Sequence, residues 1–173
     1  MSRLPLVDTK TADPDLQAVF SYFVGRGRDV PELYRTLGNS PRLLKAWTDF
    51  AWPLRNEAST PRGLRELAIM RVAQLTGADY EWHAHLPMAL EYGISSDTLD
   101  HLDGWGELDG LGEEEREILA FTDELTRDLA VSDATFAAVA RRWSPAQVVE
   151  LILTVAFYSC VSRVLRGLGI TAH

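Results

Sequence analysis

The stretch from Arg65 to Ile94 constrains this chain most strongly, because acidic and histidine side chains occur there at positions that otherwise face inward. Apolar residues recur at helical spacing on both sides of the sequence Thr76–Ala78. A glycine placed between two such segments, here Gly77, ends one helix and lets the next begin. The sequence therefore predicts two helices joined by a tight turn.

Three polar side chains of this helix pair, Glu66, Glu81 and His85, are the candidate catalytic residues. Glu81 and His85 are four residues apart, which places them on one face of the second helix. Glu66 lies next to an inward-facing position, where a carboxylate is costly unless it is paired or protonated. A histidine among carboxylates can carry a proton at neutral pH, so the set predicts general acid–base chemistry. The alternative is a buried hydrogen-bond network that only fixes the two helices.

Three further residues are candidates for substrate binding: Tyr80, His83 and Arg163. Tyr80 can donate to a substrate oxygen, although a tyrosine at a helix start more often serves packing. His83 and His85 are about 200° apart round a helix, so they cannot chelate one ion. Arg163 can hold a substrate carboxylate with two hydrogen bonds, or form a salt bridge with an acidic side chain. No zinc-binding motif occurs, and Glu81 and His85 supply only two ligands with Glu66 a third at most, so no metal is expected.

The whole chain predicts an all-α protein, because helix-start signals precede the amphipathic segments and no run alternates as a strand does. Helices are expected to begin at Asp13-Pro14, Val30-Pro31, Ser40-Pro41, Thr60-Pro61, Asp79, Ser95, Glu113, Ser132 and Ser144-Pro145. Residues 1–12 are expected to form an extended arm, and the Gly/Asp-rich stretch 104–112 a mobile or partner-facing loop. The length of 173 residues fits one domain spanning 1–173, or two small helical halves that share a core.

A weak internal repeat relates two of these helix starts. Pro61 precedes Glu66 by five residues, as Pro145 precedes Glu150, and a leucine follows each glutamate. Two explanations remain open: a duplicated helical unit, or two buried helices that both begin with a Ser/Thr-Pro pair.

Composition and charge indicate which binding partners and which cell compartment to expect. The net charge of -8 argues against nucleic acid and anionic membranes, which favour basic surfaces. The N-terminal residues have no apolar signal-peptide core, and the apolar run 151–161 is too short to span a bilayer. Cys160 is the single cysteine, so it forms no disulfide within the chain, and its apolar helix suggests an inert core residue. The expectation is a soluble, cytoplasmic protein.

The spacing of Glu66, Ala78, Glu81 and His85 resembles that of the carboxymuconolactone decarboxylase and alkyl hydroperoxidase D-like (AhpD-like) superfamily. Its thiol branch has a glutamate, two cysteines and a histidine at these four positions, so Ala78 and Glu81 stand where the cysteines would be. The segments RELAIMRVA, YEWHAH, ALEYGIS and FYSCVSRVLRGLGI also resemble this family. The similarity is sharpest over residues 61–103 and extends more weakly from 33 to 170.

The resemblance implies an AhpD-like helical bundle that assembles as a homotrimer or homohexamer, with sites near subunit boundaries. The thiol branch, which carries peroxidase and peroxiredoxin labels, needs a thiolate and a resolving thiol. The decarboxylase branch acts on a small lactone acid without metal or organic cofactor.

The leading hypothesis is accordingly a cofactor-free lyase or isomerase acting on a small unsaturated carboxylate or lactone. His85 would donate the proton. Glu81 would orient the His85 ring, and Glu66 would tune the proton affinity of that ring. The alternatives are a thiol-type hydroperoxidase relative, whose activity should be absent without the cysteines, and a non-catalytic ligand-binding or scaffolding oligomer.

Overall fold

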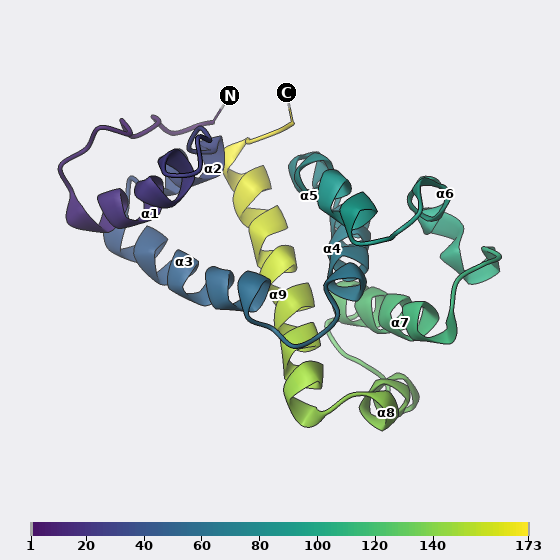
Figure 1. Cartoon of the computed structure of the whole chain (residues 1–173). Helices are drawn as coiled ribbons and strands as arrows, with labels where there is room; N and C mark the ends of the chain where they lie inside the picture. Colours follow the sequence, from purple (N-terminus) through teal and green to yellow (C-terminus); the bar gives the residue numbers. More distant parts are fainter. Residues whose placement is uncertain (1, 173) are drawn as a thin grey trace. The chain divides into compact units, whose positions relative to one another are not determined.

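The computed structural model describes residues 2–172, and every regular element in that range is helical (Figure 1). This confirms the prediction of an all-α protein. The elements are α1 (Pro14–Val24), α2 (Glu32–Leu37), α3 (Pro41–Asn56), α4 (Arg62–Thr76), α5 (Asp79–Glu91), α6 (Ser96–Asp100), the 3₁₀ helix η1 (Leu102–Glu107), α7 (Glu113–Arg127), α8 (Asp133–Arg142) and α9 (Pro145–Leu168).

The helix starts follow the sequence signals closely. The side chain of Asp13 accepts hydrogen bonds from the first turn of α1, and Ser132 caps α8 in the same way. Proline is the first residue of α1, α3 and α9, where its missing N–H costs no helical hydrogen bond. Three starts differ by one residue: α2 begins at Glu32 and α4 at Arg62, each just after its proline, and Asp79 is the first residue of α5 rather than its cap.

The described residues form two compact units, and α9 contributes to both. The first unit comprises residues 2–57 and 164–171, and the second comprises residues 58–163 with residue 172. Every candidate site residue named above belongs to the second unit.

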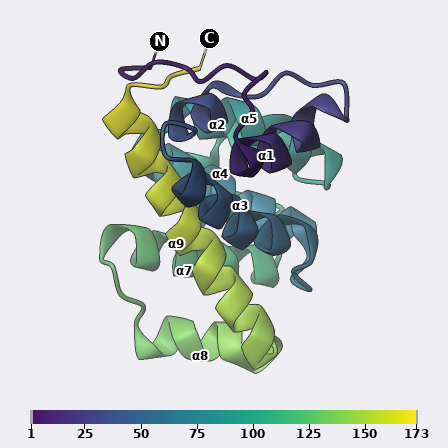
Figure 2. The same ribbon diagram turned by 90° about the vertical axis from the view of Figure 1, so that its left-hand side faces the viewer.

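In the first unit, α1 lies alongside α3 in both views (Figures 1 and 2). Its core is a cluster of apolar side chains, Leu16, Val19, Phe20, Val30 and Leu44. The N-terminal arm is extended, as predicted, and is held by backbone hydrogen bonds. Val7 N–H donates to the Arg35 carbonyl, and Arg3 N–H donates to the Leu168 carbonyl at the end of α9.

In the second unit, α4 packs against both α5 and α7, and α8 packs against α7. Every residue of α4 from Leu64 to Ala73 is buried. A helix buried on all sides shows no single apolar face, which explains why charged and apolar residues alternate along it without an obvious pattern. The core beside it consists of Leu67, Met70, Ala89, Ile94, Leu99, Leu102 and Leu119.

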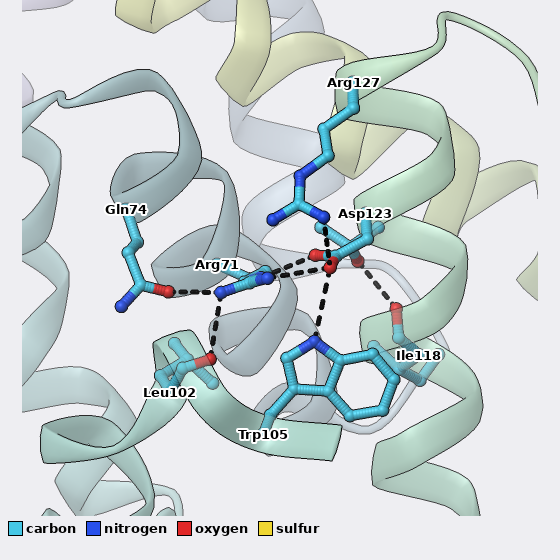
Figure 3. Close-up of polar contacts among 8 residues, drawn as sticks. Arg71, Gln74, Leu102, Trp105, Ile118, Asp123 and Arg127 are labelled. Carbon is cyan, nitrogen blue, oxygen red and sulfur yellow. Dashed lines mark hydrogen bonds and ion pairs between the residues drawn. The ribbon is translucent and has the colours of Figure 1, made fainter. Parts of the chain in front are cut away.

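A buried arginine of α4 fixes the segment around η1. The Arg71 guanidinium donates to both carboxylate oxygens of Asp123 on α7, at 2.5 and 2.7 Å, and to the Leu102 carbonyl at 2.9 Å (Figure 3). The indole N–H of Trp105 donates to the same carboxylate at 3.3 Å, and Arg116 donates to the backbone carbonyl of Trp105. The first half of the stretch expected to be a loop is therefore a 3₁₀ helix held by two arginines. The expectation of a loop was therefore wrong for residues 104–107, because glycine and aspartate content does not reveal bonds made from distant helices.

Helix α9 is longer than the apolar run that marks it in the sequence. Its 24 residues are long and apolar enough to cross a membrane by length and composition alone, which corrects the expectation drawn from residues 151–161. Half of its most apolar window is buried in the structure. The core helix of a soluble protein has these same properties, so the length and hydropathy of α9 are weak evidence for a membrane span.

Candidate active site

The candidate site is built on the turn between α4 and α5. Gly77 ends α4 in the left-handed conformation, with φ 63° and ψ 38°, and α5 begins two residues later. The tight connection lets the two helices pack along each other. The buried line of α5 is Glu81, His85 and Ala89, so the most buried face of this helix carries two ionisable side chains.

The structure brings the three candidate catalytic residues together. Glu66 is fully buried, and its Oε2 lies 2.7 Å from Nδ1 of His85. On the other side of the ring, Nε2 of His85 lies 3.4 Å from Oε2 of Glu81. Both ring nitrogens of one buried histidine therefore face carboxylates, and the contact with Glu66 is the shorter.

This environment favours the charged imidazolium. Burial by itself lowers the pKa of His85, because it removes the charged ring from water. The hydrogen bonds with Glu66 and Glu81, together with the negative charges of the two carboxylates, outweigh burial and raise the pKa above 6.5. His85 is thus positioned to hold a proton in the pH range where an unperturbed histidine loses it.

Three residues around the cluster were not predicted as part of the site. The ring of Tyr158, on α9, stands edge-to-face against His85, with centroids 4.9 Å apart. Arg62 pairs with Oε1 of Glu66, and Arg65 is buried on the same turn of α4. The spacing of four residues between Arg62 and Glu66 is the signal that could have identified this pair. No local spacing connects Tyr158 to a histidine on α5.

The start of α4, which carries both arginines, is held by Glu150 of α9. The Glu150 carboxylate accepts the backbone N–H of Ser59 at 3.0 Å and that of Thr60 at 2.8 Å, and also both hydroxyls. Burial would raise the pKa of Glu150, but these hydrogen bonds outweigh it and keep the pKa below its usual value. The carboxylate therefore fixes the segment just before α4, which has no side-chain cap of its own.

The structure does not bring His83 and Arg163, two of the three predicted substrate-binding residues, into this cluster. His83 is exposed, with Nδ1 2.7 Å from the carbonyl of Asp79 on its own helix. Arg163 is also exposed and donates to the carbonyl of Ser159, one turn back along α9. Tyr80 is half-buried at the start of α5.

Cys160 is exposed, so its assignment to the core was wrong. An apolar helix does not bury every face, and the side of α9 that carries Cys160 also carries the exposed Val149 and Leu153.

Within residues 2–172, no three His, Cys, Asp or Glu side chains converge with the geometry of a metal site. A groove of about 450 Å³ lies elsewhere in the second unit, where η1 meets α7 and α8, and its floor includes Ala120, Ala134 and Ala138. The Glu66–His85–Glu81 cluster is nearly closed by comparison, because its side chains are at most 7% exposed.

Comparison with known proteins places this arrangement in a family. The model of the carboxymuconolactone decarboxylase family matches residues 41–124. An AhpD-core, peroxidase-related protein from Ralstonia eutropha JMP134 has a TM-score of 0.83, covering 99% of this chain and 92% of its own at 19% identity. Residues 41–124 thus match the carboxymuconolactone decarboxylase family, and the chain shares the fold of AhpD-core proteins.

Other solved structures share the superfamily fold. A peroxidase-related protein from Silicibacter sp. TM1040 has a TM-score of 0.79 at 17% identity, covering 100% of this chain and 95% of its own. The debrominase Bmp8 has a TM-score of 0.81 at 18% identity, covering 99% of this chain and 92% of its own. A Bmp8 variant with one cysteine replaced by alanine has also been solved in complex with 2,3,4-tribromopyrrole. A search of curated proteins finds no match.

The two positions at which this sequence departs from the thiol pattern that it resembles lie at the site itself. Ala78 is buried at the start of α5, and Glu81 faces His85 one turn later. A carboxylate thus stands beside the histidine where the thiol branch has a cysteine. This replaces a redox-active thiol with a carboxylate, which has no thiol–disulfide chemistry but can accept or release a proton.

Proposed function

We propose that this chain is a cofactor-free enzyme that performs proton-transfer chemistry, decarboxylation or isomerisation, on a small unsaturated carboxylate or lactone. The observation that carries the proposal is the clamp on His85, whose two ring nitrogens face the buried carboxylates of Glu66 and Glu81. A histidine whose pKa is raised by two buried carboxylates is suited to act as a general acid.

The distances favour particular roles for the three residues. Glu66 holds Nδ1 at 2.7 Å and is fully buried, so it orients the ring and stabilises its charge. Nε2 makes the longer contact, 3.4 Å to Glu81, so it is the nitrogen that can deliver a proton to substrate. Glu81 then stands beside the donor and can return a proton to it. The sequence had suggested that Glu81 orients and Glu66 tunes the ring, and the geometry favours the reverse.

In a decarboxylation the bond between the substrate carbon and its carboxylate breaks, and the electron pair moves into the adjacent unsaturated system. Carbon dioxide leaves, and the carbon that gains the electron pair takes the proton from Nε2 of His85. An isomerisation uses the same groups, with Glu81 accepting a proton at one carbon and His85 donating one at another. Neither reaction requires an electron donor or acceptor.

Thiol chemistry is not proposed for this chain. Peroxide reduction in the thiol branch needs two cysteines, and this chain has one, which is exposed on α9 while His85 is buried on α5. The relation to a debrominase indicates that the fold supports several reactions, so the choice among them depends on the side chains at the site.

The test is single-turnover kinetics on a panel of small unsaturated lactone acids, carboxymuconolactone among them. His85→Gln is expected to lower the rate by about 10²- to 10⁴-fold, the contribution typical of a general acid. His83→Gln is the matched control, because His83 lies two residues away on the same helix but is exposed.

Circular dichroism would establish that each variant is folded. Equal rates for wild type and His85→Gln, or an equal loss in His83→Gln, would reject the assignment. A wild-type protein that turns over none of the panel, while its melting temperature falls in the His85→Gln variant, would favour the non-catalytic oligomer.

We further propose that the chain acts as a homo-oligomer, as the superfamily resemblance implies. Val149 and Leu153 leave apolar surface exposed along α9, by 52% and 36% of each residue, which suits burial against a second copy. Sedimentation equilibrium at micromolar concentration is expected to give a mass above 19.3 kDa, and the monomer mass alone would count against assembly.

A further inference from the structure

Helix α9 supplies an aromatic wall beside His85. The ring of Tyr158 stands edge-to-face against the His85 imidazole, with the centroids 4.9 Å apart and the ring planes at 89°. This is one of the favoured arrangements of two aromatic rings in direct contact. Tyr158 and His85 are each 3% exposed, so neither ring can move without displacing its neighbours. The imidazole is thus bounded by an aromatic ring as well as by two carboxylates.

Two hydrogen-bonded contacts hold this part of α9 in place, one near each end of α4. Just before α4, the backbone N–H of Thr60 donates to the Glu150 carboxylate at 2.8 Å. At the last residue of α4, the Thr76 hydroxyl donates to Oγ of Ser162 at 3.0 Å. The hydroxyl of Ser162, which is 1% exposed, in turn donates to the backbone carbonyl of Tyr158 at 2.9 Å. These bonds connect α9 to both ends of the helix that carries Glu66.

Tyr158 lies between these two contacts, eight residues after Glu150 and four residues before Ser162. At the rise of an α-helix these separations are about 12 and 6 Å along the axis. Because α9 is tied on both sides of Tyr158, it cannot slide along α4 or turn about its own axis without breaking one of the two contacts. The backbone that carries the Tyr158 ring is therefore fixed relative to the cluster.

The contacts of His85 require that its ring keeps one orientation. Nδ1 lies 2.7 Å from Glu66, whereas Nε2 lies 3.4 Å from Glu81, which is longer than a normal hydrogen bond. The last side-chain torsion of histidine has broad minima, so its own rotamer preference does not fix the ring. One short hydrogen bond at Nδ1 still allows the imidazole to pivot. A packing neighbour is needed to keep Nε2 on the side of Glu81.

We propose that Tyr158 is a positioning residue of the site, which holds the His85 ring so that Nδ1 stays on Glu66 and Nε2 faces Glu81. The role rests on the proposed function, because it concerns how Nε2 is presented to a substrate. It belongs to the ring of Tyr158 and not to its hydroxyl. Tyr158→Phe should therefore preserve the arrangement, and Tyr158→Leu, which keeps an apolar side chain but removes the ring, should lose it.

The test is proton NMR of the full-length protein with ¹⁵N-labelled histidine. A proton held between Nδ1 of His85 and a buried carboxylate makes a short, charge-assisted hydrogen bond, so it is expected to give a sharp downfield signal. Its absence from His85→Gln assigns it. Wild type and Tyr158→Phe are expected to show this signal, with an NOE from the aromatic ring at position 158 to His85. In Tyr158→Leu the signal is expected to broaden or disappear, because the imidazole turns between orientations.

Phe121→Leu is the matched control, because it also removes a fully buried ring of the second unit, but from α7 instead of α9. It is expected to lower the melting temperature and to leave the His85 signal as in wild type. Kinetics give a second readout on any substrate that wild type turns over. Tyr158→Leu is expected to lower kcat by about 10²-fold with little change in KM, the cost of misplacing a reacting group by about 1 Å, and Tyr158→Phe should keep the wild-type kcat.

Three results would overturn the positioning role. They are a wild-type protein without an NOE between the two rings, a His85 signal as sharp in Tyr158→Leu as in wild type, and loss of the signal in Phe121→Leu. The last result would show that any loss of core packing releases the imidazole. If Tyr158→Leu does not fold, the wild-type NOE and the Tyr158→Phe spectrum decide, and a missing NOE or a signal lost in Tyr158→Phe would contradict the proposal.

The NMR signal does not depend on turnover. A His85 signal that requires the Tyr158 ring, in a protein that turns over no lactone acid, would keep Tyr158 as the residue that positions His85 and would remove the proposed reaction. Turnover that is lost in His85→Gln but unchanged in Tyr158→Leu would keep the reaction and overturn the positioning role.

Discussion

At the scale of single residues, His85 experiences two opposing effects. Desolvation disfavours its charge, and two carboxylates favour it, with the net result that the folded-state pKa lies above 6.5. A group whose pKa is raised by folding stabilises the folded state fully below its unfolded pKa, and that contribution is lost as pH rises through the folded pKa. The two carboxylates around His85 are therefore fully stabilising below a pH of about 6.5, and their contribution is lost as pH rises through the raised pKa of His85.

A second residue shows local strain. Leu129 follows α7 with φ 58° and is 74% exposed, so a leucine occupies the left-handed position that normally carries glycine at the end of a helix. Leu129→Gly is expected to raise the free energy of unfolding by about 0.5–1 kcal/mol, because the left-handed conformation costs a residue with a Cβ about 1–2 kcal/mol. Urea denaturation would measure the change.

Leu129→Ala is the control for this prediction, because alanine removes the exposed side chain but keeps the Cβ. Equal stabilisation by alanine and glycine would show that the backbone strain is not the cause.

At this scale the sequence predicted part of the site for clear reasons. Glu81 and His85 are one helical turn apart, and a single tight turn brings Glu66 back to them, so local spacing was sufficient. Tyr158 approaches His85 from a helix more than seventy residues away, and no local pattern encodes that contact.

At the scale of helices, α4 is the element on which the site depends. It is buried along its length, carries Arg62, Arg65 and Glu66, and has its start fixed from a distance by Glu150. The helix starts were predictable because proline and capping residues act locally. The bonds from Ser59 and Thr60, just before α4, to Glu150 were not predictable, since Thr60 and Glu150 are separated by ninety residues.

The close approach of α4 to the end of α5 yields a prediction. A Cβ added to Gly63 would lie 2.7 Å from the backbone carbonyl oxygen of Tyr92, which cannot rotate away as a side chain can. Gly63→Ala is expected to destabilise the protein by about 1–3 kcal/mol through overpacking, despite the better helix propensity of alanine. Thermal or urea unfolding would measure it.

Gly167→Ala provides the comparison, because Gly167 is also helical and a Cβ there meets nothing within 4 Å. That variant should be neutral or stabilised by up to about 1 kcal/mol. A Gly63→Ala protein as stable as Gly167→Ala would show that the two helix ends are not in tight contact.

At the scale of the whole molecule, the all-α class followed from helix signals spread over the entire chain, so it did not depend on any one of them. The division into two units was left open by the sequence, because length and composition do not report which helices pack together. The possible internal repeat also remains a prediction. The two glutamates that suggest it differ in their surroundings, with Glu66 fully buried against His85 and Glu150 half-buried against Ser59 and Thr60.

The charge of the whole chain also bears on the proposed site. With a net charge of -8, the protein as a whole repels anions, so an anionic substrate must be attracted locally. Two cations lie beside the cluster: Arg62, which pairs with Glu66 and is 16% exposed, and the buried Arg65. The proposal that the site is catalytic therefore depends on whether the surrounding charges raise the pKa of His85.

The most direct test is the NMR titration of the His85 imidazole in wild type and in Glu66→Gln. We predict a wild-type pKa above 6.5, and a lower pKa in Glu66→Gln, because burial then remains while one carboxylate is lost. A wild-type pKa at or below 6.5, or a value unchanged by Glu66→Gln, would contradict the view that two buried carboxylates keep His85 charged for proton transfer.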